Sequence, residues 1–504
     1  MRIEGLAGRF TARAAAAPEA IYARFGWEEI TWRALADAAE SFAQGFARAG
    51  LRRGDRAVVM MHNSPASLAV VFALLKSGVV WVPANPALVG EALAHVIRKV
   101  SAGRVICEPG VVDSLRRCDA VSEDRLMVIA DPALPPAPAG PAPARLAPAP
   151  VPQDLAAIMF TSGTTGPAKG VRVTHMMLEL AAKSVGICAD ARPGDTFYMW
   201  EPFYHIGGAQ VLLLPLFTDI SLSIRSRFSA SRFWQDVRQT GATHIHHLGG
   251  IIQLLLKQQP GPQDRDHKVR VAWGGGCAPE AWRPFEQRFG VEIRECYGMT
   301  EASSLTTCNL EGVVGSIGRP MPWFDVRLKG ADGHEVGAGE GPGEIVVTTT
   351  LPGAIFDGYY EAPEATARAL RPDGFHTGDL GSMDENGMLY FHGRTGDSLR
   401  CRGENVSAWE VEGAANRHPA VEDSAMVGVP AKIGENDIHL FVRLRPGSET
   451  TATELAAWLD TELAPFQRPR FLTFVADFPR TASQRIQKHL LKDLPPRWER
   501  PGRG

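Results

Sequence analysis

The spacing of apolar and polar positions in the first part of the chain alternates between the helical and the strand period. An alanine-rich stretch over residues 32–40 follows Thr31, and this pattern predicts a helix with Thr31 as its N-cap. Apolar runs at 56–61 and 79–83 predict buried strands, and residues 66–76 between them have the pattern of a helix. This order of strand, helix and strand predicts a mainly parallel sheet with helices on its faces.

The C-terminal part of the chain has a different pattern. Residues 343–391 show short strand patterns separated by turns rich in glycine, asparagine and aspartate, and a break follows near 393–397. Beyond the break the pattern predicts a helix over 408–417, strands over 424–429 and 439–444, a helix over 453–463 and a strand over 470–474. We therefore expect a large domain over 1–396 and a small α+β domain over 397–504.

A stretch dominated by proline and alanine interrupts the large domain at residues 131–152. This composition is typical of an extended surface linker. A strand pattern follows it directly, so we interpret the stretch as a connection inside the large domain and not as a domain boundary.

The composition narrows the class of protein. The chain has 504 residues, of which 45% are hydrophobic and 22% charged, and this favours two or more globular domains. Its net charge of −3 gives no electrostatic reason to expect nucleic acid or a membrane surface as a partner. No signal peptide and no run long enough to span a bilayer is visible. Seven scattered cysteines without a CxxC pair fit reduced thiols, and we expect a cytoplasmic protein.

The most informative segment covers residues 158–170, which read IMFTSGTTGPAKG. An apolar run, interpreted as a buried strand, ends in hydroxyls and glycines, and Lys169 follows closely. Glycines let backbone N–H groups approach a polyanion, while the hydroxyls and the lysine add donors and charge, so the segment suits nucleotide phosphates. The spacing differs from the Walker pattern, because Lys169 is followed by glycine. A surface loop without a ligand is the simpler alternative.

Two further segments offer groups that suit a nucleotide. A strand predicted over 269–272 leads into Trp273, and three glycines follow, Gly274, Gly275 and Gly276. They let a flat ring press against the backbone, although glycine runs also make ordinary turns. Residues 295–301 supply an aromatic ring for stacking, a hydroxyl and a carboxylate in quick succession. Glu301 at the end of this segment can hold Mg²⁺ against phosphates; the alternative is an exposed acid at a strand–helix junction.

The sites nearer the C-terminus are less specific by themselves. Asp379 ends the sequence Thr-Gly-Asp, and one carboxylate can accept from both hydroxyls of a ribose, but aspartate also caps ordinary turns. Arg394 is a second candidate contact for ribose or phosphate, and Gly403 permits a close approach to the backbone. His244, His246 and His247 form a cluster without the accompanying residues of a metal site, so we interpret them as core or pocket-lining histidines. In a strand, His244 and His246 share a face and His247 does not.

Taken together, these motifs resemble those of the adenylate-forming superfamily, which contains acyl-CoA synthetases, adenylation domains and luciferases. They occur in the superfamily's order and spacing, and the resemblance covers most of the chain, from near Phe25 to near Leu490. Within the superfamily the chain most resembles crotonobetaine/carnitine-CoA ligases and related small-acid acyl-CoA ligases. The segments that carry this closer resemblance are 356–360, 365–367, 375–379 and 403–407.

The resemblance implies a fold and a reaction. The implied fold is α/β: a large N-terminal domain of parallel-rich sheets with flanking helices and a small β-barrel-like subdomain, and then a small mobile α+β domain. The implied reaction is that of an ATP-dependent acid-CoA ligase. The carboxylate of a small acid attacks the α-phosphate of MgATP, and CoA then takes the acyl group from the acyl-adenylate. ATP, Mg²⁺ and CoA are the implied cofactors and co-substrates.

The resemblance also implies roles for individual residues. His205 would line the carboxylate pocket, Asp397 would be the hinge, and Gly403 would lie beside the pantetheine arm of CoA. The residues implied in catalysis are Lys169, Glu301, Arg485, Lys488 and His205, with Glu301 as the Mg²⁺ ligand. The implied nucleotide contacts are Thr161, Ser162, Gly163, Thr164, Thr165, Gly166, Gly274, Gly275, Gly276, Glu295, Cys296, Tyr297, Thr300, Asp379, Arg394 and Gly403. The candidates for the acid pocket are Tyr204, His205, His247, Trp273 and Leu305, which suggest a modest-sized, partly polar or aromatic acid.

The chain departs from the superfamily near its C-terminal end. The superfamily usually has Gly-Lys where this chain has Gln484-Arg485, and that lysine contacts the reacting carboxylate and the α-phosphate. Arg485 keeps the charge as a planar fork, and Lys488 lies three residues further on. Three outcomes are open. In the first, Arg485 or Lys488 supplies the positive charge in an acid-CoA ligase. In the second, the enzyme uses another acceptor or anion, as an amine ligase or a nitrite-using diazotase-like enzyme does, and in the third the chain binds nucleotide without adenylation. The sequence does not decide the acid or the oligomeric state.

Overall fold

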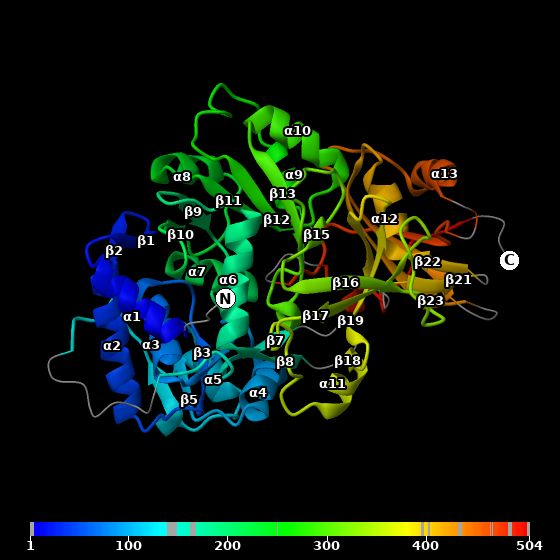
Figure 1. Ribbon diagram of the computed structural model, residues 1–504. Helices are drawn as coiled ribbons and strands as arrows, with labels where there is room; N and C mark the ends of the chain where they lie inside the picture. The colour runs from blue at the N-terminus through cyan, green and yellow to red at the C-terminus, as the bar shows by residue number, and fades with distance from the viewer. Residues whose placement is uncertain are drawn as a thin grey trace. The chain divides into compact units, whose positions relative to one another are not determined.

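The protein forms two compact units (Figure 1). The computed structural model describes residues 5–138, 149–161, 168–248, 250–394, 398–401, 404–431, 436–463, 465, 467–481 and 486–500. The first unit joins Met1–Asp325 to Val347–Phe375, and the second joins Val326–Val346 to His376–Gly504. Gly396 and Asp397 lie outside the described residues, so the boundary expected between them and the hinge role of Asp397 stay predictions.

The first unit contains a nine-stranded sheet with a parallel centre. In sheet order its strands are β15 (Arg319–Pro320), β14 (Thr307–Cys308), β13 (Glu292–Tyr297), β12 (Val271–Gly275), β11 (His244–Leu248), β9 (Thr196–Met199), β10 (Ser221–Ile224), β1 (Ile21–Phe25) and β2 (Glu28–Thr31). The strands from β13 to β1 run parallel, and the strands outside them are antiparallel. The carboxyl ends of β9, β11, β12 and β13 therefore lie side by side, at the end of the sheet where α/β proteins bind ligands.

A second sheet of the same unit has six strands. Its order is β6 (Leu126–Val128), β5 (Arg104–Cys107), β3 (Arg56–Met60), β4 (Val80–Pro83), β7 (Leu155–Thr161) and β8 (Lys169–Thr174). Only the pair β7–β8 is antiparallel. The two parallel-rich sheets agree with the expected α/β class.

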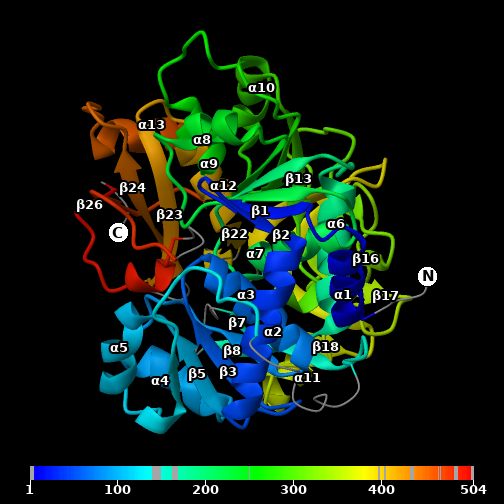
Figure 2. The same ribbon diagram turned by 90° about the vertical axis from the view of Figure 1, so that its left-hand side faces the viewer.

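Helices separate and cover these strands. Those of the first unit are α1 (Leu6–Ala16), α2 (Trp32–Arg48), α3 (Pro65–Ser77), α4 (Gly90–Lys99), α5 (Val112–Arg117), α6 (His175–Cys188), α7 (Ile206–Leu213), α8 (Phe233–Thr240), α9 (Ile251–Leu256), α10 (Pro279–Phe289) and α11 (Pro363–Ala369). Helices α1, α2 and α3 pack against one another (Figure 2). Helix α3 is apolar on nearly every side and almost completely buried, as expected for a helix inside a large core.

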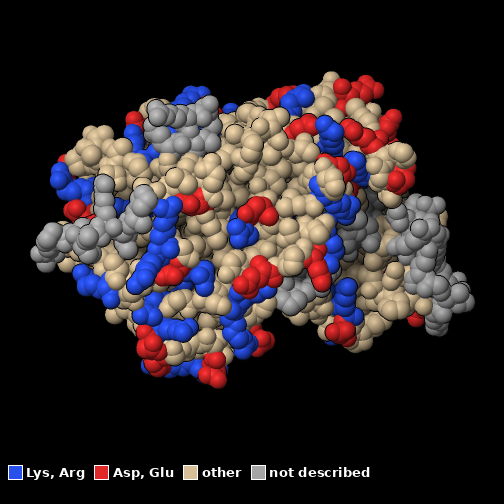
Figure 3. Space-filling view, turned by 60° about the horizontal axis from the view of Figure 1, so that its bottom comes forward, with Lys and Arg blue, Asp and Glu red and all other residues tan. Residues whose placement is uncertain are grey.

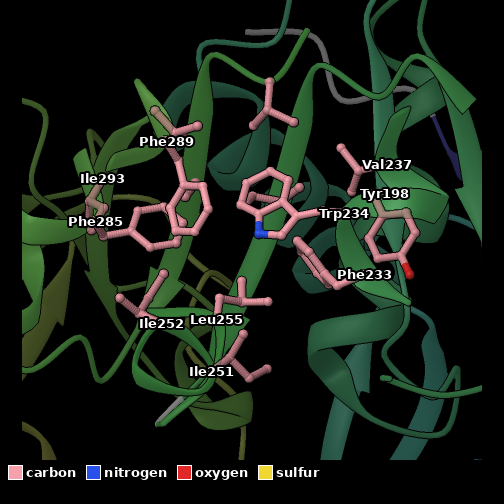
Figure 4. Close-up of a cluster of buried hydrophobic side chains, with 14 of the residues drawn as sticks. Tyr198, Phe233, Trp234, Val237, Ile251, Ile252, Leu255, Phe285, Phe289 and Ile293 are labelled. Atoms are coloured by element: carbon pink, nitrogen blue, oxygen red, sulfur yellow. The ribbon is translucent and has the colours of Figure 1, made fainter. Parts of the chain in front are cut away.

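A cluster of aromatic and aliphatic side chains fixes α8, α9 and α10 against one face of the nine-stranded sheet (Figure 4). Trp234 of α8 lies between its neighbour Phe233 and Phe289 of α10. Its ring centroid is 5.4 Å from that of Phe233 and 4.5 Å from that of Phe289. Burying aromatic side chains of this size removes a large apolar area from water, which is the main favourable term in folding. The packing anchors the strand ends that carry the candidate site.

The elements predicted from the pattern of the first unit are confirmed, with one correction. Thr31 caps α2, because its hydroxyl accepts from the N–H of Ala34 at 3.2 Å. The strand predicted over 269–272 is instead β12, Val271–Gly275, so that Gly274 and Gly275 belong to the strand. They pair with His247 and Leu248 of β11, and glycine permits the close approach that this pairing requires.

A five-stranded sheet follows along the chain. Its strands are β16 (Phe324–Lys329), β17 (Gly343–Thr349), β19 (Gly374–Met383) and β18 (Leu370–Arg371) in that order, with β20 (Leu389–Arg394) paired to β19. The antiparallel register of β19 and β20 sets Asp379 directly opposite Arg394. The expected series of short strands in this part of the chain is confirmed.

The second unit also contains a small α+β core. It has a two-stranded ribbon, β21 (Ser398–Cys401) and β22 (Glu404–Ser407), and a four-stranded sheet of β23 (Val421–Pro430), β24 (Asn436–Leu444), β25 (Phe471–Phe474) and β26 (Trp498–Glu499). Helices α12 (Ala408–Asn416) and α13 (Ala452–Glu462) bury apolar side chains against that sheet. The predicted order of helix, two strands, helix and strand is confirmed.

Charged side chains of both signs are mixed on one face of the molecule. On the face drawn in Figure 3, basic and acidic side chains are interspersed, in keeping with the net charge of −3. None of the helices in the described part of the chain reaches the length and apolarity that a membrane crossing requires.

Candidate active site

The loop predicted to hold phosphates joins β7 to β8. These strands form an antiparallel hairpin in which Thr161 stands opposite Lys169 and Phe160 opposite Gly170. The hydroxyl of Thr161 donates to the carbonyl of Lys169 at 3.5 Å. The other predicted loop contacts, Ser162, Gly163, Thr164, Thr165 and Gly166, lie outside the described residues. The hairpin therefore fixes both ends of the loop to one strand pair.

Lys169 and Glu301 are far apart in sequence, but each of them contacts Tyr359. The ammonium of Lys169 lies 4.8 Å from the centre of the Tyr359 ring, and the Tyr359 hydroxyl donates to Oε1 of Glu301 at 2.9 Å. Glu301 is buried, and its carbonyl accepts from the N–H of Phe356 at 2.8 Å. A cation and a carboxylate thus share one aromatic residue beside the loop, as a site for a metal-bound polyphosphate requires.

The short 3₁₀ helix over Thr300–Ala302 is held by a tightly folded turn. A Cβ on Gly298 would overlap the carbonyl oxygen of Ser304, so only glycine fits there. Ser303 and Ser304 both have positive φ, at 50° and 72°, which is uncommon for non-glycine residues and frequent at functional sites. Thr300, Glu301 and Leu305 are all buried around this turn. The turn fixes Glu301 against Tyr359.

The ends of β11, β12 and β13 bring His247, Gly274 and Glu295 into one row. A Cβ on Gly274 would overlap the carbonyl oxygen of His247, and the φ of Gly274 is +154°. This glycine is therefore required by strand packing, whatever else binds there. Glu295 accepts from the N–H groups of Gly276 and Cys277, so its carboxyl group holds the glycine turn in place.

Burial shifts the pKa values of Glu295 and His247 in opposite directions. Burial raises the pKa of Glu295 to about 8, although the two backbone donors act against that rise. Burial lowers the pKa of His247 to about 3, and the nearby His246 adds to the effect. Within the described chain neither ring nitrogen of His247 has a hydrogen-bond partner. At neutral pH both His247 and Glu295 are therefore uncharged.

Cys296 and Tyr297 complete the end of β13. Tyr297 is largely buried, and its carbonyl accepts from the N–H of Thr306 at 2.8 Å. Cys296 stands opposite Cys308 in the antiparallel register, and Cys308 Sγ lies 2.7 Å from Cys188 Sγ. All three thiols are buried, and burial raises the pKa of the Cys188 thiol well above its ordinary value, so Cys188 is not a nucleophile.

His205 and Tyr204 sit at the start of α7, near the end of β9. His205 is the N-cap residue of α7, and its side chain is exposed, while Tyr204 is half-buried. Trp273 is buried on β12, with its ring centre 4.0 Å from that of His246. His246 in turn pairs with the carboxylate of Glu201, Nδ1 to Oε2 at 2.7 Å. As predicted, His246 and His247 lie on opposite faces of β11.

In the second unit the predicted ribose contacts meet. Arg394 Nε lies 3.1 Å from Asp379 Oδ1, and Asp379 is buried. The hydroxyl of Thr377 accepts from the N–H of Asp379 at 3.1 Å and donates to the carbonyl of Ile345 at 2.7 Å. Gly403 lies outside the described residues. The carboxylate is thus held by its own turn and by an arginine.

The candidates for the charge role near the C-terminus differ in their surroundings. Lys488 begins a short 3₁₀ helix, and its Nζ lies 2.9 Å from Oε1 of Glu412 on α12. The same oxygen of Glu412 accepts from the N–H of Met426 at 2.6 Å. Arg485 lies outside the described residues. Lys488 therefore has a contact that stabilises the small unit itself.

Three residues of the site were not among the sequence candidates: Tyr359, Glu201 and Asn63. Tyr359 stands in the segment that carried the family resemblance, and the preceding Gly358, with φ +137°, marked an unusual turn. An acidic residue between Trp200 and Pro202, in an otherwise apolar segment, was the available signal for Glu201. Asn63 had no signal beyond its place between β3 and α3.

Comparison with known proteins decides the family. The family model described as AMP-binding enzyme matches residues 10–360, well over half of the chain. The chain belongs to the AMP-binding enzyme family. A second model, described as AMP-binding enzyme C-terminal domain, matches residues 410–485. The resemblance to the adenylate-forming superfamily is confirmed.

Individual relatives of this AMP-binding enzyme cover nearly its whole length. The crotonobetaine/carnitine–CoA ligase of Salmonella enteritidis is 30% identical over 491 residues, with 92% of this chain and 93% of the relative covered. ATP-bound MatB from Rhodopseudomonas palustris is 26% identical with a TM-score of 0.87, covering 97% of this chain and 98% of the other.

A third comparison supports the fold alone. The o-succinylbenzoate CoA synthetase (MenE) from Bacillus subtilis, in complex with the acyl-adenylate OSB-AMP, is 22% identical with a TM-score of 0.86, over 98% of this chain and 99% of the other. The expected fold, a large α/β domain and a small C-terminal domain of an adenylate-forming enzyme, is confirmed.

Proposed function

We propose that this enzyme is an AMP-forming acid–CoA ligase for a small carboxylic acid. The carboxylate oxygen forms a bond to the α-phosphorus of ATP while pyrophosphate leaves. The CoA thiolate then bonds to the acyl carbon, AMP leaves, and the thiol proton goes to solvent. Membership of the family and the 30% identity to a crotonobetaine/carnitine–CoA ligase support this assignment.

The observation that carries the proposal is the contact of both Lys169 and Glu301 with Tyr359 at the base of the loop. Phosphoryl chemistry of this kind depends on positioning and on neutralising charge. Lys169 supplies a positive charge for the phosphates, and Tyr359 orients the carboxylate of Glu301. Lys169, Glu301 and Tyr359 come from three separate segments of the chain, and the fold brings them into contact.

The residues present fit a magnesium ion bound through the nucleotide. Mg²⁺ is commonly held by one or two carboxylates together with substrate phosphates and water. Glu301 offers such a carboxylate, and among the described residues no three His, Cys, Asp or Glu side chains form a metal cluster of their own. When bound, the ion would neutralise phosphate charge; Glu301 would hold it and Tyr359 would orient Glu301.

The acid would bind near His205 and Tyr204, with His247, Trp273 and Leu305 as the remaining candidates. Trp273 lies with His246 on the face of the sheet opposite His247, so only one of Trp273 and His247 would line the pocket. Their aromatic and imidazole groups suit a modest-sized acid with polar or aromatic parts. In the second unit we assign Asp379 and Arg394 to the ribose, Gly403 to the pantetheine arm and Asp397 to the hinge. The match of residues 410–485 to the C-terminal domain of AMP-binding enzymes supports a separate small domain. We place the enzyme in the cytoplasm, because all seven cysteines are buried free thiols.

A screen of AMP release tests the function. The enzyme is incubated with ATP, Mg²⁺ and crotonobetaine, carnitine, o-succinylbenzoate, benzoate or short alkanoates, each with and without CoA. We expect AMP with at least one acid and a thioester when CoA is added. If AMP forms without a thioester, or only when an amine or nitrite is present, the acceptor is not CoA. ATP binding by calorimetry without AMP under any condition would overturn the ligase assignment.

Two substitutions test which cation contacts the reacting carboxylate. Loss of such a charge should slow adenylate formation by about a hundredfold or more, while thioester formation from preformed adenylate survives. Arg485→Ala and Lys488→Ala are compared with Glu412→Gln, which breaks the Lys488 pair but leaves the lysine in place. If Lys488→Ala and Glu412→Gln have the same effect, Lys488 acts through the structure of the small domain and Arg485 is the remaining candidate.

A further inference from the structure

A buried asparagine joins the two sheets of the large unit at the segment that carries His205. Asn63 lies between β3 and α3 and is 7% exposed. Its Nδ2 donates to the carbonyl of Glu201 at 2.7 Å, and its Oδ1 accepts from the N–H of Phe203 at 2.9 Å. A weaker contact of Nδ2 reaches the carbonyl of Arg225 at 3.4 Å. One side chain therefore satisfies both a buried carbonyl and a buried N–H of the same irregular segment.

The side chain of Glu201 fixes this segment from a second direction. Glu201 is 3% exposed, and its Oε2 lies 2.7 Å from Nδ1 of His246 on β11. His246 itself is held, because its carbonyl accepts from Trp200 Nε1 at 3.1 Å and its ring lies against Trp273. This short contact between two buried side chains limits where the Glu201 side chain can lie.

The start of α7 fixes the segment from a third direction. A Cβ on Gly207 would overlap the Glu201 carboxylate, and a Cβ on Gly208 would overlap the carbonyl of Pro202. The N–H of His205 donates to that carbonyl at 3.1 Å, and the carbonyl of His205 accepts from Ala209. The chain from 201 to 208 thus has little freedom, although it has no strand neighbour.

We infer that Asn63 is a positioning residue for His205, which it holds at the acid-binding site through the backbone of residues 201–203. The inference rests on the proposed function for the role of His205, but the contacts of Asn63 do not depend on it. The two partners of its amide lie 138 and 140 positions away in sequence, so the clamp links the end of β3 to the end of β9. Displacing a substrate-contacting residue by about an ångström can reduce a rate by a hundredfold.

The chain offers a closely matched control in Asn309. This asparagine is also buried, its Nδ2 donates to the carbonyls of Val313 and Ser316 at 2.6 and 2.9 Å, and its Oδ1 accepts from the N–H of Val313 at 3.2 Å. It therefore makes the same kind of backbone clamp in another loop. Asn309→Ala should reduce stability without a selective effect on acid binding.

The experiment measures steady-state AMP release for Asn63→Ala, Asn63→Asp and Asn309→Ala, with the best acid of the screen above. For Asn63→Ala we expect the KM for the acid to rise about tenfold or more while the KM for ATP stays within about twofold. Asn63→Asp keeps the acceptor for Phe203 but turns an oxygen, in place of the donor, towards the carbonyls of Glu201 and Arg225, so its acid KM should rise at least as much as that of Asn63→Ala. Equal changes in both KM values, as for Asn309→Ala, would overturn the positioning role.

Hydrogen exchange read by mass spectrometry separates this inference from the proposed function, since it needs no substrate. Peptides covering residues 200–208 should exchange about tenfold faster in Asn63→Ala, and peptides over 309–316 should not change. The opposite pattern is expected for Asn309→Ala. Unchanged protection of 200–208 in Asn63→Ala would overturn the inference even if the enzyme is an active ligase. A wild-type protein that releases no AMP, but shows this exchange pattern, would contradict only the ligase assignment. If Asn63→Ala does not fold, Asn63→Asp serves for the same comparison.

Discussion

His247 and Glu295 face each other across Gly274, with Nε2 and Oε2 4.0 Å apart, and both are uncharged at neutral pH. The two groups reach neutrality from opposite directions, because burial disfavours the charged form of an acid and of a base alike. Their contact is therefore not an ion pair in the free enzyme. Two neutral, polar side chains therefore lie beside the glycine turn. Each of them changes the free energy of unfolding over its own pH range.

Glu295 should make the protein less stable as the pH rises. Burial raises its pKa from 4.5 to about 8, so between these values the folded chain holds a proton that the unfolded chain has lost. The free energy of unfolding then falls by up to about 1.4 kcal/mol for each pH unit in this window. Urea unfolding of wild type and Glu295→Gln at pH 5 and 8 measures this, with a flatter dependence expected for the variant. Glu292→Gln, exposed on the same strand, is the control and should follow wild type.

His247 should act on the acid side with the opposite sign. Burial lowers its pKa from 6.5 to about 3, so below pH 6.5 the unfolded chain binds a proton that the folded chain excludes. Stability is therefore lost as the pH falls from about 6.5 towards about 3. His247→Phe should lose less stability than wild type between pH 6.5 and 4.5 in urea unfolding. Parallel curves for the two proteins would show that His247 is not buried as a neutral base.

The local patterns of the chain predicted much of the fold because they depend on near neighbours. The N-cap at Thr31, the buried strands β3 and β4 and the helix α3 follow from residues within a few positions of each other. The bounds of β12 could not be predicted, because Gly274 joins the strand through its pairing with His247 on β11 and Glu295 on β13. A glycine run carries no strand signal by itself, and tertiary pairing decides its conformation.

Family motifs that are continuous in sequence marked Lys169, Glu301 and Asp379 as candidates, and the structure brings Lys169 and Glu301 together at Tyr359. The contacts that orient these residues could not be predicted from the sequence. Tyr359 reaches Glu301 across 58 positions, and Asn63 reaches Phe203 across 140. No local periodicity encodes such pairs, so only the folded chain reveals which residues support the site.

Gly274→Ala should be strongly destabilising. A Cβ there would overlap the carbonyl of His247, and the φ of +154° disfavours any side chain. Because both obstacles lie in the backbone of a central strand, we expect a loss of more than about 2 kcal/mol of unfolding free energy. Gly45→Ala in α2 is the control: a Cβ meets nothing within 4 Å there, and alanine should gain up to about 1 kcal/mol in a helix. Urea unfolding compares the two, and a similar result for both would contradict the clash at Gly274.

Tyr359 should support AMP formation through two contacts that can be removed one at a time, its hydroxyl to Glu301 and its ring beside Lys169. Tyr359→Phe keeps the ring beside Lys169 but removes the hydroxyl that donates to Glu301. A hydrogen bond to a charged group is worth about 1.5–3 kcal/mol, so the rate should fall roughly ten- to hundredfold and half-maximal activity should need more Mg²⁺. Tyr359→Leu also removes the cation–π contact and should fall further, by about two- to fivefold.

Tyr360→Phe provides the matched control, since the structure shows no hydrogen bond from the Tyr360 hydroxyl to a described residue and this side chain packs against the core of the six-stranded sheet. Its rate and Mg²⁺ dependence should stay within about twofold of wild type, because removing a hydroxyl without such a hydrogen bond has little effect. The measurement is AMP release at saturating ATP and acid over a range of Mg²⁺ concentrations. If Tyr359→Phe needs no more Mg²⁺ than Tyr360→Phe, Tyr359 does not orient Glu301 for the metal.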